Sequence, residues 1–266
     1  MVPVLFLMGV GPFARWKEAS IGELVRTLRW AFAAAVIVAI VLPFAYGSWK
    51  IMTALGLLLA AWIVLAGTLN FVERVQATRA GGSFMAAVLK QPRTFFGMHT
   101  AHVGVAAFVI GVTMVQSYQE EKDVKMGPGD TVSVAGYEFR FNGVRQVEGP
   151  NYMALAGDFD LVRNGKVLRK MQPEKRNYAS SSMPMTEAAI DAGLFRDLYV
   201  SLGEPIDRLK PEGEWAVRVY HKPFVDWIWG GCVLMAIGGL IAILDRRYRV
   251  KARQTSTIST GNTQTA

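Results

Sequence analysis

The sequence is poor in the residue types that carry thiol and metal chemistry. It contains one cysteine, Cys232, and three histidines among 266 residues. A single cysteine excludes a disulfide or a Cys-x-x-Cys redox pair within this chain, and its position in an apolar run is typical of a small buried side chain. No P-loop, Ser-His-Asp set or paired-carboxylate site is recognisable. These absences argue against soluble hydrolytic chemistry and assign any thiol chemistry to a partner.

Charge is distributed unevenly along the chain. The net charge is +8 at pH 7, and 52% of the residues are hydrophobic. The stretches 15–29, 73–93 and 245–253 carry 13 Lys or Arg against four Asp or Glu, a balance of +9, whereas 119–222 has 15 basic and 16 acidic residues, a balance of −1. Basic flanks of apolar runs are typical of the cytoplasmic side of a membrane protein. The excess charge therefore indicates membrane orientation and not a nucleic-acid surface.

Long apolar runs predict a membrane α-helical bundle. A helix rises about 1.5 Å per residue, so the run 94–116 would be roughly 34 Å long, enough for a hydrocarbon core of about 30 Å. The predicted order is a partial or re-entrant apolar segment at 1–14, three transmembrane helices at 30–46, 51–71 and 94–116, a β-rich domain at 117–222, a last transmembrane helix at 223–244, and a basic anchor with a disordered tail at 245–266. The fold class is thus a four-helix membrane bundle with an inserted extracytoplasmic all-β domain.

Short, alternating, turn-bounded segments predict the β-rich domain. Strands are expected at 131–134, 137–147, 153–163, 167–171, 194–202 and 215–220, with an irregular or short helical insertion at 185–192. Asn164-Gly165 between two of these segments is a strong type I′ hairpin signal. Residues 137–141 alternate aromatic and charged side chains, which is typical of a strand with one face in the core.

The apolar run 94–116 carries two histidines, which makes it the main candidate for a functional site. On a helix, Gly97, Ala101, Gly104 and Gly111 form a small-residue face of the kind that allows close packing of transmembrane helices. His102 lies on the other face, with His99 on an adjoining turn. Ionisable groups at membrane depth usually face a bundle interior or a cofactor. Two interpretations remain open for each histidine: a cofactor ligand, or a hydrogen-bonding contact between helices.

Three further features have both a functional and a structural interpretation. His221 precedes the last span and is either an interfacial polar contact or a functional group. Trp227 and Trp229 are either belt anchors near the lipid headgroups or stacking partners of a planar cofactor. The basic run from Arg163 to Arg176 is either a solvated strand face or a surface that meets an acidic partner. The structural interpretation is favoured for each.

Five strings carry a resemblance that covers the chain from residue 3 to residue 253. They are LMGVGPFARWK, AHVGVAAFVIGV, GPNYMALAGDFDLVRNGK, PEKRNYASSSMPMTEAAIDAGLFRDLYVSLGE and YHKPFVDWIWGGCVLMAIGG. They resemble the C-terminal part of the CcmF family of cytochrome c-type biogenesis proteins, the membrane haem lyase subunits of the cytochrome c maturation system. The PEKRNY and MPMTEAAID strings are the most specific.

The resemblance implies a cofactor and a ligand. Members of this family hold a b-type haem in the membrane between two transmembrane histidines, and the AHVG string places His102 at the second of these. His102 is therefore expected to be an axial ligand of the haem iron, with His99 as a secondary candidate. A backbone carbonyl or Asn70 is expected to accept from the other ring nitrogen of His102.

The resemblance also implies partners and a location. The family's tryptophan-rich WWD segment, its flanking histidines and its first haem ligand have no counterpart in this sequence, so we expect a C-terminal fragment or one half of a split system that is inactive alone. Expected partners are an N-terminal half or another haem lyase subunit, a haem chaperone, apocytochrome c and a thiol-handling subunit. The expected location is the bacterial inner membrane, with the β-rich domain periplasmic and the C-terminus cytoplasmic. The alternative is a membrane-anchored scaffold that binds no haem.

Overall fold

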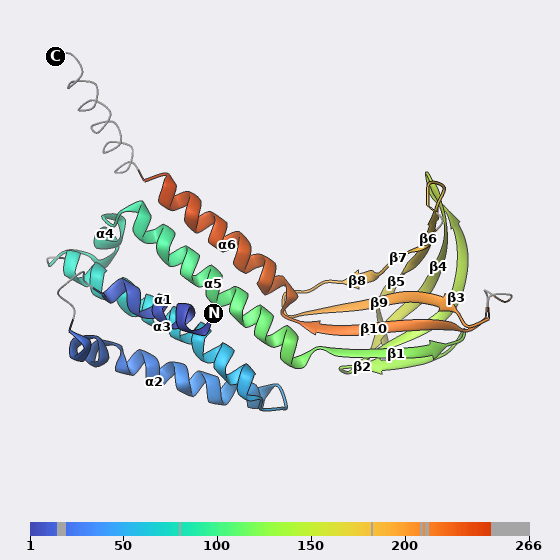
Figure 1. The fold of residues 1–266 in the computed structure, drawn as a ribbon, viewed down its shortest axis with the longest axis horizontal. Helices are drawn as coiled ribbons and strands as arrows, with labels where there is room; N and C mark the ends of the chain where they lie inside the picture. Colours follow the sequence, from blue (N-terminus) through green and yellow to red (C-terminus); the bar gives the residue numbers. More distant parts are fainter. Residues whose placement is uncertain (15–19, 80, 182, 208–209, 211–212, 246–266) are drawn as a thin grey trace, which may run out of the picture. The chain divides into compact units, whose positions relative to one another are not determined.

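The chain forms two compact units. A computed structural model describes residues 1–14, 20–79, 81–181, 183–207, 210 and 213–245. The helical unit comprises Met1–Thr113 and Trp227–Ala266, and the β unit comprises Met114–Asp226 (Figure 1). The expected basic residues 15 and 17, the anchor residues 246–249 and the tail lie outside the described residues.

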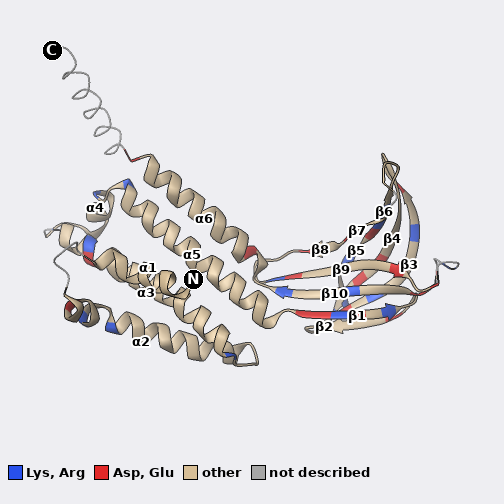
Figure 2. Cartoon of the chain, in the orientation of Figure 1, with Lys and Arg blue, Asp and Glu red and all other residues tan. Residues whose placement is uncertain are grey.

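Six α-helices and one short 3-10 helix are found in the described residues. They are α1 (Val2–Val10), η1 (Gly11–Phe13), α2 (Ile21–Ala45), α3 (Ile51–Arg79), α4 (Phe84–Leu89), α5 (Arg93–Tyr118) and α6 (Val225–Ile243). Helices α2, α3, α5 and α6 are long and apolar enough to cross a membrane. Figure 2 shows these four helices almost free of charge along their length, with Lys, Arg, Asp and Glu near the helix ends and on the strands.

Helices α2 and α3 extend several residues beyond the apolar runs that predicted them. Helix α2 begins at Ile21 and not at residue 30, because the hydroxyl of Ser20 accepts a hydrogen bond from the backbone N–H of Glu23 at 3.2 Å and caps the helix. Helix α3 continues to Arg79. Hydropathy marks the part of a helix that suits lipid, whereas backbone hydrogen bonding decides where the helix ends.

Helices α5 and α6 meet through glycines. A Cβ atom built on Gly104 would lie 2.7 Å from the carbonyl oxygen of Gly231, and one built on Gly97 would lie 2.5 Å from that of Gly238. Backbones this close require small residues. Beyond α6, Asp245 accepts from the backbone N–H of Thr94 at 3.0 Å, which caps the start of α5. The predicted small-residue face of the histidine helix is confirmed as a packing face.

The N-terminal helix α1 packs on α3. The indole N–H of Trp62 donates to the carbonyl oxygen of Phe6 at 2.8 Å, and the two rings stack at 5.5 Å. The amide of Asn70 donates to the carbonyl oxygen of Pro12 at 3.3 Å. Asn70 therefore links η1 to α3, and it is not the partner of a histidine.

The β unit is a curled antiparallel sandwich (Figure 1). One sheet has the order β1-β10-β9-β8, and the other has the order β2-β3-β4-β6-β7 with β5 on β4. The strands are β1 (Glu120–Met126), β2 (Thr131–Val134), β3 (Tyr137–Glu148), β4 (Tyr152–Arg163), β5 (Lys166–Met171), β6 (Glu174–Tyr178), β7 (Met185–Glu187), β8 (Ala189–Asp191), β9 (Arg196–Pro205) and β10 (Trp215–Pro223). Large side chains from both sheets, including Phe139, Phe159, Leu198 and Trp215, form the core.

Sequence pattern predicted six strands of this unit, β2 to β5, β9 and β10, and missed β1, β6, β7 and β8. The Asn164-Gly165 turn has φ of 52° and 73°, as a type I′ hairpin requires. Residues 137–141 alternate buried and exposed as expected. The expectation of an irregular or helical segment at 185–192 was wrong, because these residues form β7 and β8. Three-residue strands are too short for alternation to show, and pairing with β6 and β9 creates them.

Candidate functional site

A small groove between α3 and α5 contains both intramembrane histidines. Its volume is about 190 Å³. The lining residues are Ile63, Val64, Gly67, Thr68, Phe71, His99, His102 and Val103. All but the two imidazoles and one hydroxyl are apolar. The structure thus brings together the two histidines that the sequence singled out, in a mostly apolar groove.

One ring nitrogen of His102 is fixed and the other is available. Its Nδ1 lies 2.8 Å from the carbonyl oxygen of Met98, one turn earlier on α5. A carbonyl can only accept, so Nδ1 carries the proton and Nε2 carries a lone pair. Within the described part of the chain, Nε2 makes no hydrogen bond. A neutral imidazole held through Nδ1 with Nε2 free is the state in which histidine binds a metal.

His99 differs because both of its nitrogens lie against carbonyl oxygens. Nδ1 is 2.9 Å from the oxygen of Phe95, and Nε2 is 3.1 Å from the oxygen of Gly67 on α3. Its ring also contacts Phe95 and Phe71, with centroid distances of 4.3 and 5.4 Å. A neutral ring carries one N–H and donates to one of the two carbonyl oxygens, while the carbonyl beside the other nitrogen occupies the position that a metal ion would need.

The groove fits one face of a haem site but does not enclose a ligand. Pockets that hold cofactors are about 300–1,000 Å³, and this groove is smaller than that range. The lining provides one imidazole nitrogen without a hydrogen bond among the described residues, Nε2 of His102, and apolar contact from Val64, Phe71 and Val103. A macrocycle bound here would need a second wall and a second axial ligand from outside the described residues.

The comparisons with known proteins agree with this architecture. The family model described as the CcmF C-terminal beta-sandwich matches residues 117–223. The cytochrome c-type biogenesis protein CcmF of Pseudomonas aeruginosa is 42% identical over 253 residues, which are 95% of this chain and 37% of that protein. The CcmF of Escherichia coli is 38% identical over 94% of this chain and 36% of that protein. The chain belongs to the CcmF family.

A solved CcmF structure shows the same fold. The structure of a cytochrome c heme lyase CcmF superposes with a TM-score of 0.73 at 24% identity, over 91% of this chain and 38% of that chain. The predicted fold class, four candidate membrane helices with a β-sandwich, is confirmed. This chain spans a little over a third of the length of the CcmF proteins that it matches.

The basic run of this CcmF-family chain is used within the β unit. Arg163 lies over the ring of Tyr137 at 4.7 Å and donates to its hydroxyl at 3.0 Å. Arg169 pairs with Asp191 at 2.8 Å, and Lys175 pairs with Glu204 at 2.7 Å. Burial alone would raise the pKa of Asp191, but hydrogen bonds from two arginines outweigh it and the pKa falls below its usual value. The run is mainly an ion-paired strand surface.

His221 lies in β10 with one buried nitrogen. Its Nδ1 has no hydrogen-bond partner among the described residues. Burial is the main cause that lowers its pKa below the usual range; nearby Arg196 adds to the effect and Glu120 opposes it. The two tryptophans considered as stacking partners are at the start of α6, and Trp229 is exposed on the helix surface. No contact in the described residues makes either of them part of the histidine groove.

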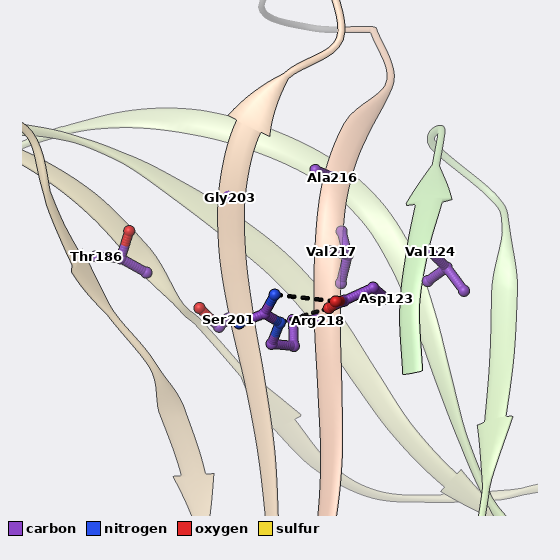
Figure 3. A pocket seen from close by; sticks show the side chains of 8 residues that line it. All are labelled: Asp123, Val124, Thr186, Ser201, Gly203, Ala216, Val217 and Arg218. Carbon is purple, nitrogen blue, oxygen red and sulfur yellow. Dashed lines mark hydrogen bonds and ion pairs between the residues drawn. The ribbon is translucent and has the colours of Figure 1, made fainter. Parts of the chain in front are cut away.

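Sequence reasoning missed a wider groove on the β unit, drawn in Figure 3. Its volume is about 510 Å³, and its lining includes Thr186, Ser201 and Gly203. Arg218 and Asp123 meet there side by side, with Nη2 of the arginine 2.9 Å from Oδ2 of the aspartate. The hydrogen bond from Arg218 is the main cause of a lowered pKa of Asp123. The two charges neutralise each other, and the described residues contain no cluster that could hold a metal ion.

Proposed function

We propose that this chain forms part of a bacterial membrane haem lyase of cytochrome c maturation, and that His102 supplies one axial ligand to a b-type haem within the membrane. The observation that carries the proposal is the hydrogen bond from Nδ1 of His102 to the carbonyl oxygen of Met98, which leaves Nε2 as a ligand. The CcmF relatives are cytochrome c-type biogenesis proteins, which supports the assignment to cytochrome c biogenesis.

Each residue at the site has a defined task. The Met98 carbonyl holds the His102 ring in one tautomer and makes Nε2 more basic, as outer hydrogen bonds do for metal-bound histidines. His99 joins α5 to α3 through Gly67 and so fixes the helix that carries His102. Val64 and Phe71 exclude water from the groove. Haem bound here would supply a one-electron redox centre whose potential depends on its axial ligands.

The incomplete groove is the reason to assign the second ligand to another chain or segment. An N-terminal half of the family, or another haem lyase subunit, is the partner that fits. The β unit would then serve as a periplasmic docking domain for apocytochrome c, the haem chaperone and a thiol-handling subunit. The placement of charge supports this orientation: Arg26 and Arg29 are near the start of α2, Arg79 ends α3 and Arg93 begins α5.

The test is the absorption spectrum of the dithionite-reduced assembly of this chain with an N-terminal half of the family. The unchanged assembly should give a six-coordinate b-type spectrum. His102→Gly should lose it, and added imidazole should restore it by binding in the space that the side chain vacates. His99→Ala is the matched control, and it should retain haem with at most a partial loss. Equal haem retention in both variants would contradict the ligand assignment.

A scaffold that binds no haem is the second candidate. The feature that favours it is the groove, which is too small to enclose a cofactor by itself. In that case the assembly would form and stay free of haem, and both histidine variants would change only its stability. The same spectra therefore separate the two functions.

A further inference from the structure

The turn between β8 and β9 has large apolar side chains at its tip. The backbone N–H of Arg196 donates to the carbonyl oxygen of Gly193 at 3.2 Å, which closes a four-residue β-turn. The side chains of Leu194 and Phe195, at the two central positions, are 62% and 58% exposed. Turn tips that face water usually carry Gly, Pro, Asn, Asp or Ser. Two large apolar side chains at a turn tip are therefore expected to contact something other than water.

The shape of the turn is fixed by a buried carboxylate on β9. Asp197 is buried, and its Oδ1 accepts a hydrogen bond from the backbone N–H of Gly193 at 3.1 Å. Its Oδ2 accepts from the hydroxyl of Tyr199 at 3.2 Å. A buried carboxylate with two donors holds the turn in place, so the two apolar side chains are presented on a rigid support.

The turn lies beside the point where the chain enters a spanning helix. The backbone N–H of Phe224 donates to the carbonyl oxygen of Phe195 at 3.2 Å. The two rings meet edge to face, with centroids 5.7 Å apart. Helix α6 begins at the next residue, Val225. A residue directly before a spanning helix lies at the membrane surface, and its ring partner Phe195 therefore lies at the same level.

The junction between α5 and β1 lies at the same end of the sheet as the junction between β10 and α6. Helix α5 ends at Tyr118, and β1 begins at Glu120, which pairs with His221 near the end of β10. Both covalent connections to spanning helices thus leave the β unit at the end that carries the turn. The opposite end of β9, near Ile206, has no such connection in the described residues.

The strand residues next to the turn have the composition of a membrane interface. Tyr199 and Tyr220 meet edge to face at 6.3 Å. The ammonium group of Lys222 lies over both rings, 5.3 and 4.8 Å from their centroids. Tyrosine belts and lysines with extended stems are typical of the headgroup region.

We propose that the Gly193–Arg196 turn inserts Leu194 and Phe195 into the interfacial layer of the lipid bilayer. The turn gives the β unit an attachment to the membrane surface besides its two covalent junctions. The ligand is the bilayer itself, recognised through apolar contact below the headgroups and through tyrosine and lysine at their level. The inference does not depend on haem and applies whichever side of the membrane the β unit occupies.

The test places a fluorescent label on the turn of the full chain in lipid vesicles. Cys232→Ser removes the only cysteine, and Leu194→Cys or Phe195→Cys then accepts a bimane label. The quenchers are iodide in water and a phospholipid with a nitroxide near its headgroup. Ile206→Cys is the matched control, because Ile206 is also a large apolar residue, 51% exposed, at the far end of β9.

Labels at 194 and 195 should be quenched several-fold more by the nitroxide lipid than the label at 206, and several-fold less by iodide. Iodide quenching at 194 and 195 equal to that at 206 would overturn the proposal. Protection from both quenchers would also overturn it and would indicate a protein cover. The measurement uses the chain without haem, so failure of the haem assignment leaves its outcome unaffected.

Discussion

The helical unit buries small side chains more often than the β unit does. In the β unit the fully buried residues are large, among them Trp215, Phe139 and Phe141. In the helical unit many of the most buried residues are alanines, such as Ala35 and Ala66, whereas bulky apolar side chains such as those on α2 point outward. Water drives the first arrangement through burial of apolar area. In lipid that force is absent, and close backbone packing takes its place.

The largest expected effect comes from emptying the core of the β unit. Trp215 is 0% exposed, and removal of a buried Trp or Phe side chain costs about 3–5 kcal/mol. Trp215→Ala should therefore lower the urea midpoint of the β unit strongly, measured by near-ultraviolet circular dichroism of the full chain in micelles. Trp229→Ala is the control, since Trp229 is 69% exposed on α6. Equal losses for the two variants would refute the contrast between the units.

A side chain added between α5 and α6 should have an intermediate effect on the helical unit. Gly104→Leu puts carbon where a Cβ already lies 2.7 Å from a backbone oxygen. Overpacking of this kind costs about 1–3 kcal/mol. We expect helix unfolding at lower SDS fraction, followed by far-ultraviolet circular dichroism. Gly230→Leu should change little, because nothing lies within 4 Å of a Cβ on Gly230. A stable Gly104→Leu variant would show that the glycine contact is dispensable.

The smallest expected effect is a pH dependence confined to the β unit. The pKa of His221 in the folded state lies below its usual 6.5, mainly through burial. The unfolded state then binds more protons between the two pKa values, so the free energy of unfolding falls as the pH drops below about 6.5. His221→Gln should flatten this slope in urea titrations at different pH values. The lowered pKa of Asp191 acts only in stronger acid, so an unchanged slope near pH 6 would exclude His221 as the cause.

The sequence pattern predicted local structure correctly where a single helix face, turn or strand determines it. The glycine face of α5, the Asn164-Gly165 hairpin and the alternation of residues 137–141 follow from local chemistry and are seen in the structure. The sequence did not reveal β1, β6, β7 or β8. Their residues are charged or few, and pairing across the sheet determines their conformation.

At the candidate site too, the sequence alone did not determine the roles of the two histidines. Spacing placed His102 and His99 near one another and left both interpretations open for each. The structure adds contacts that spacing does not encode: the carbonyl of Gly67, far along the chain, lies against Nε2 of His99, whereas Nε2 of His102 has no hydrogen-bond partner among the described residues. Whether a polar group is free or bonded depends on neighbours from other elements. A histidine in an apolar run therefore indicates a site, and its tertiary contacts indicate its role.

The pairing of β1 with β10 has a consequence for how the membrane helices assemble. Glu120 lies opposite His221, so folding of the sandwich brings the end of α5 and the start of α6 together on the chain. The two helices then meet at a high effective concentration. The entropy cost of closing the long segment between them is offset by the folding of the β unit. The β unit thus acts as a covalent tether that keeps the end of α5 close to the start of α6.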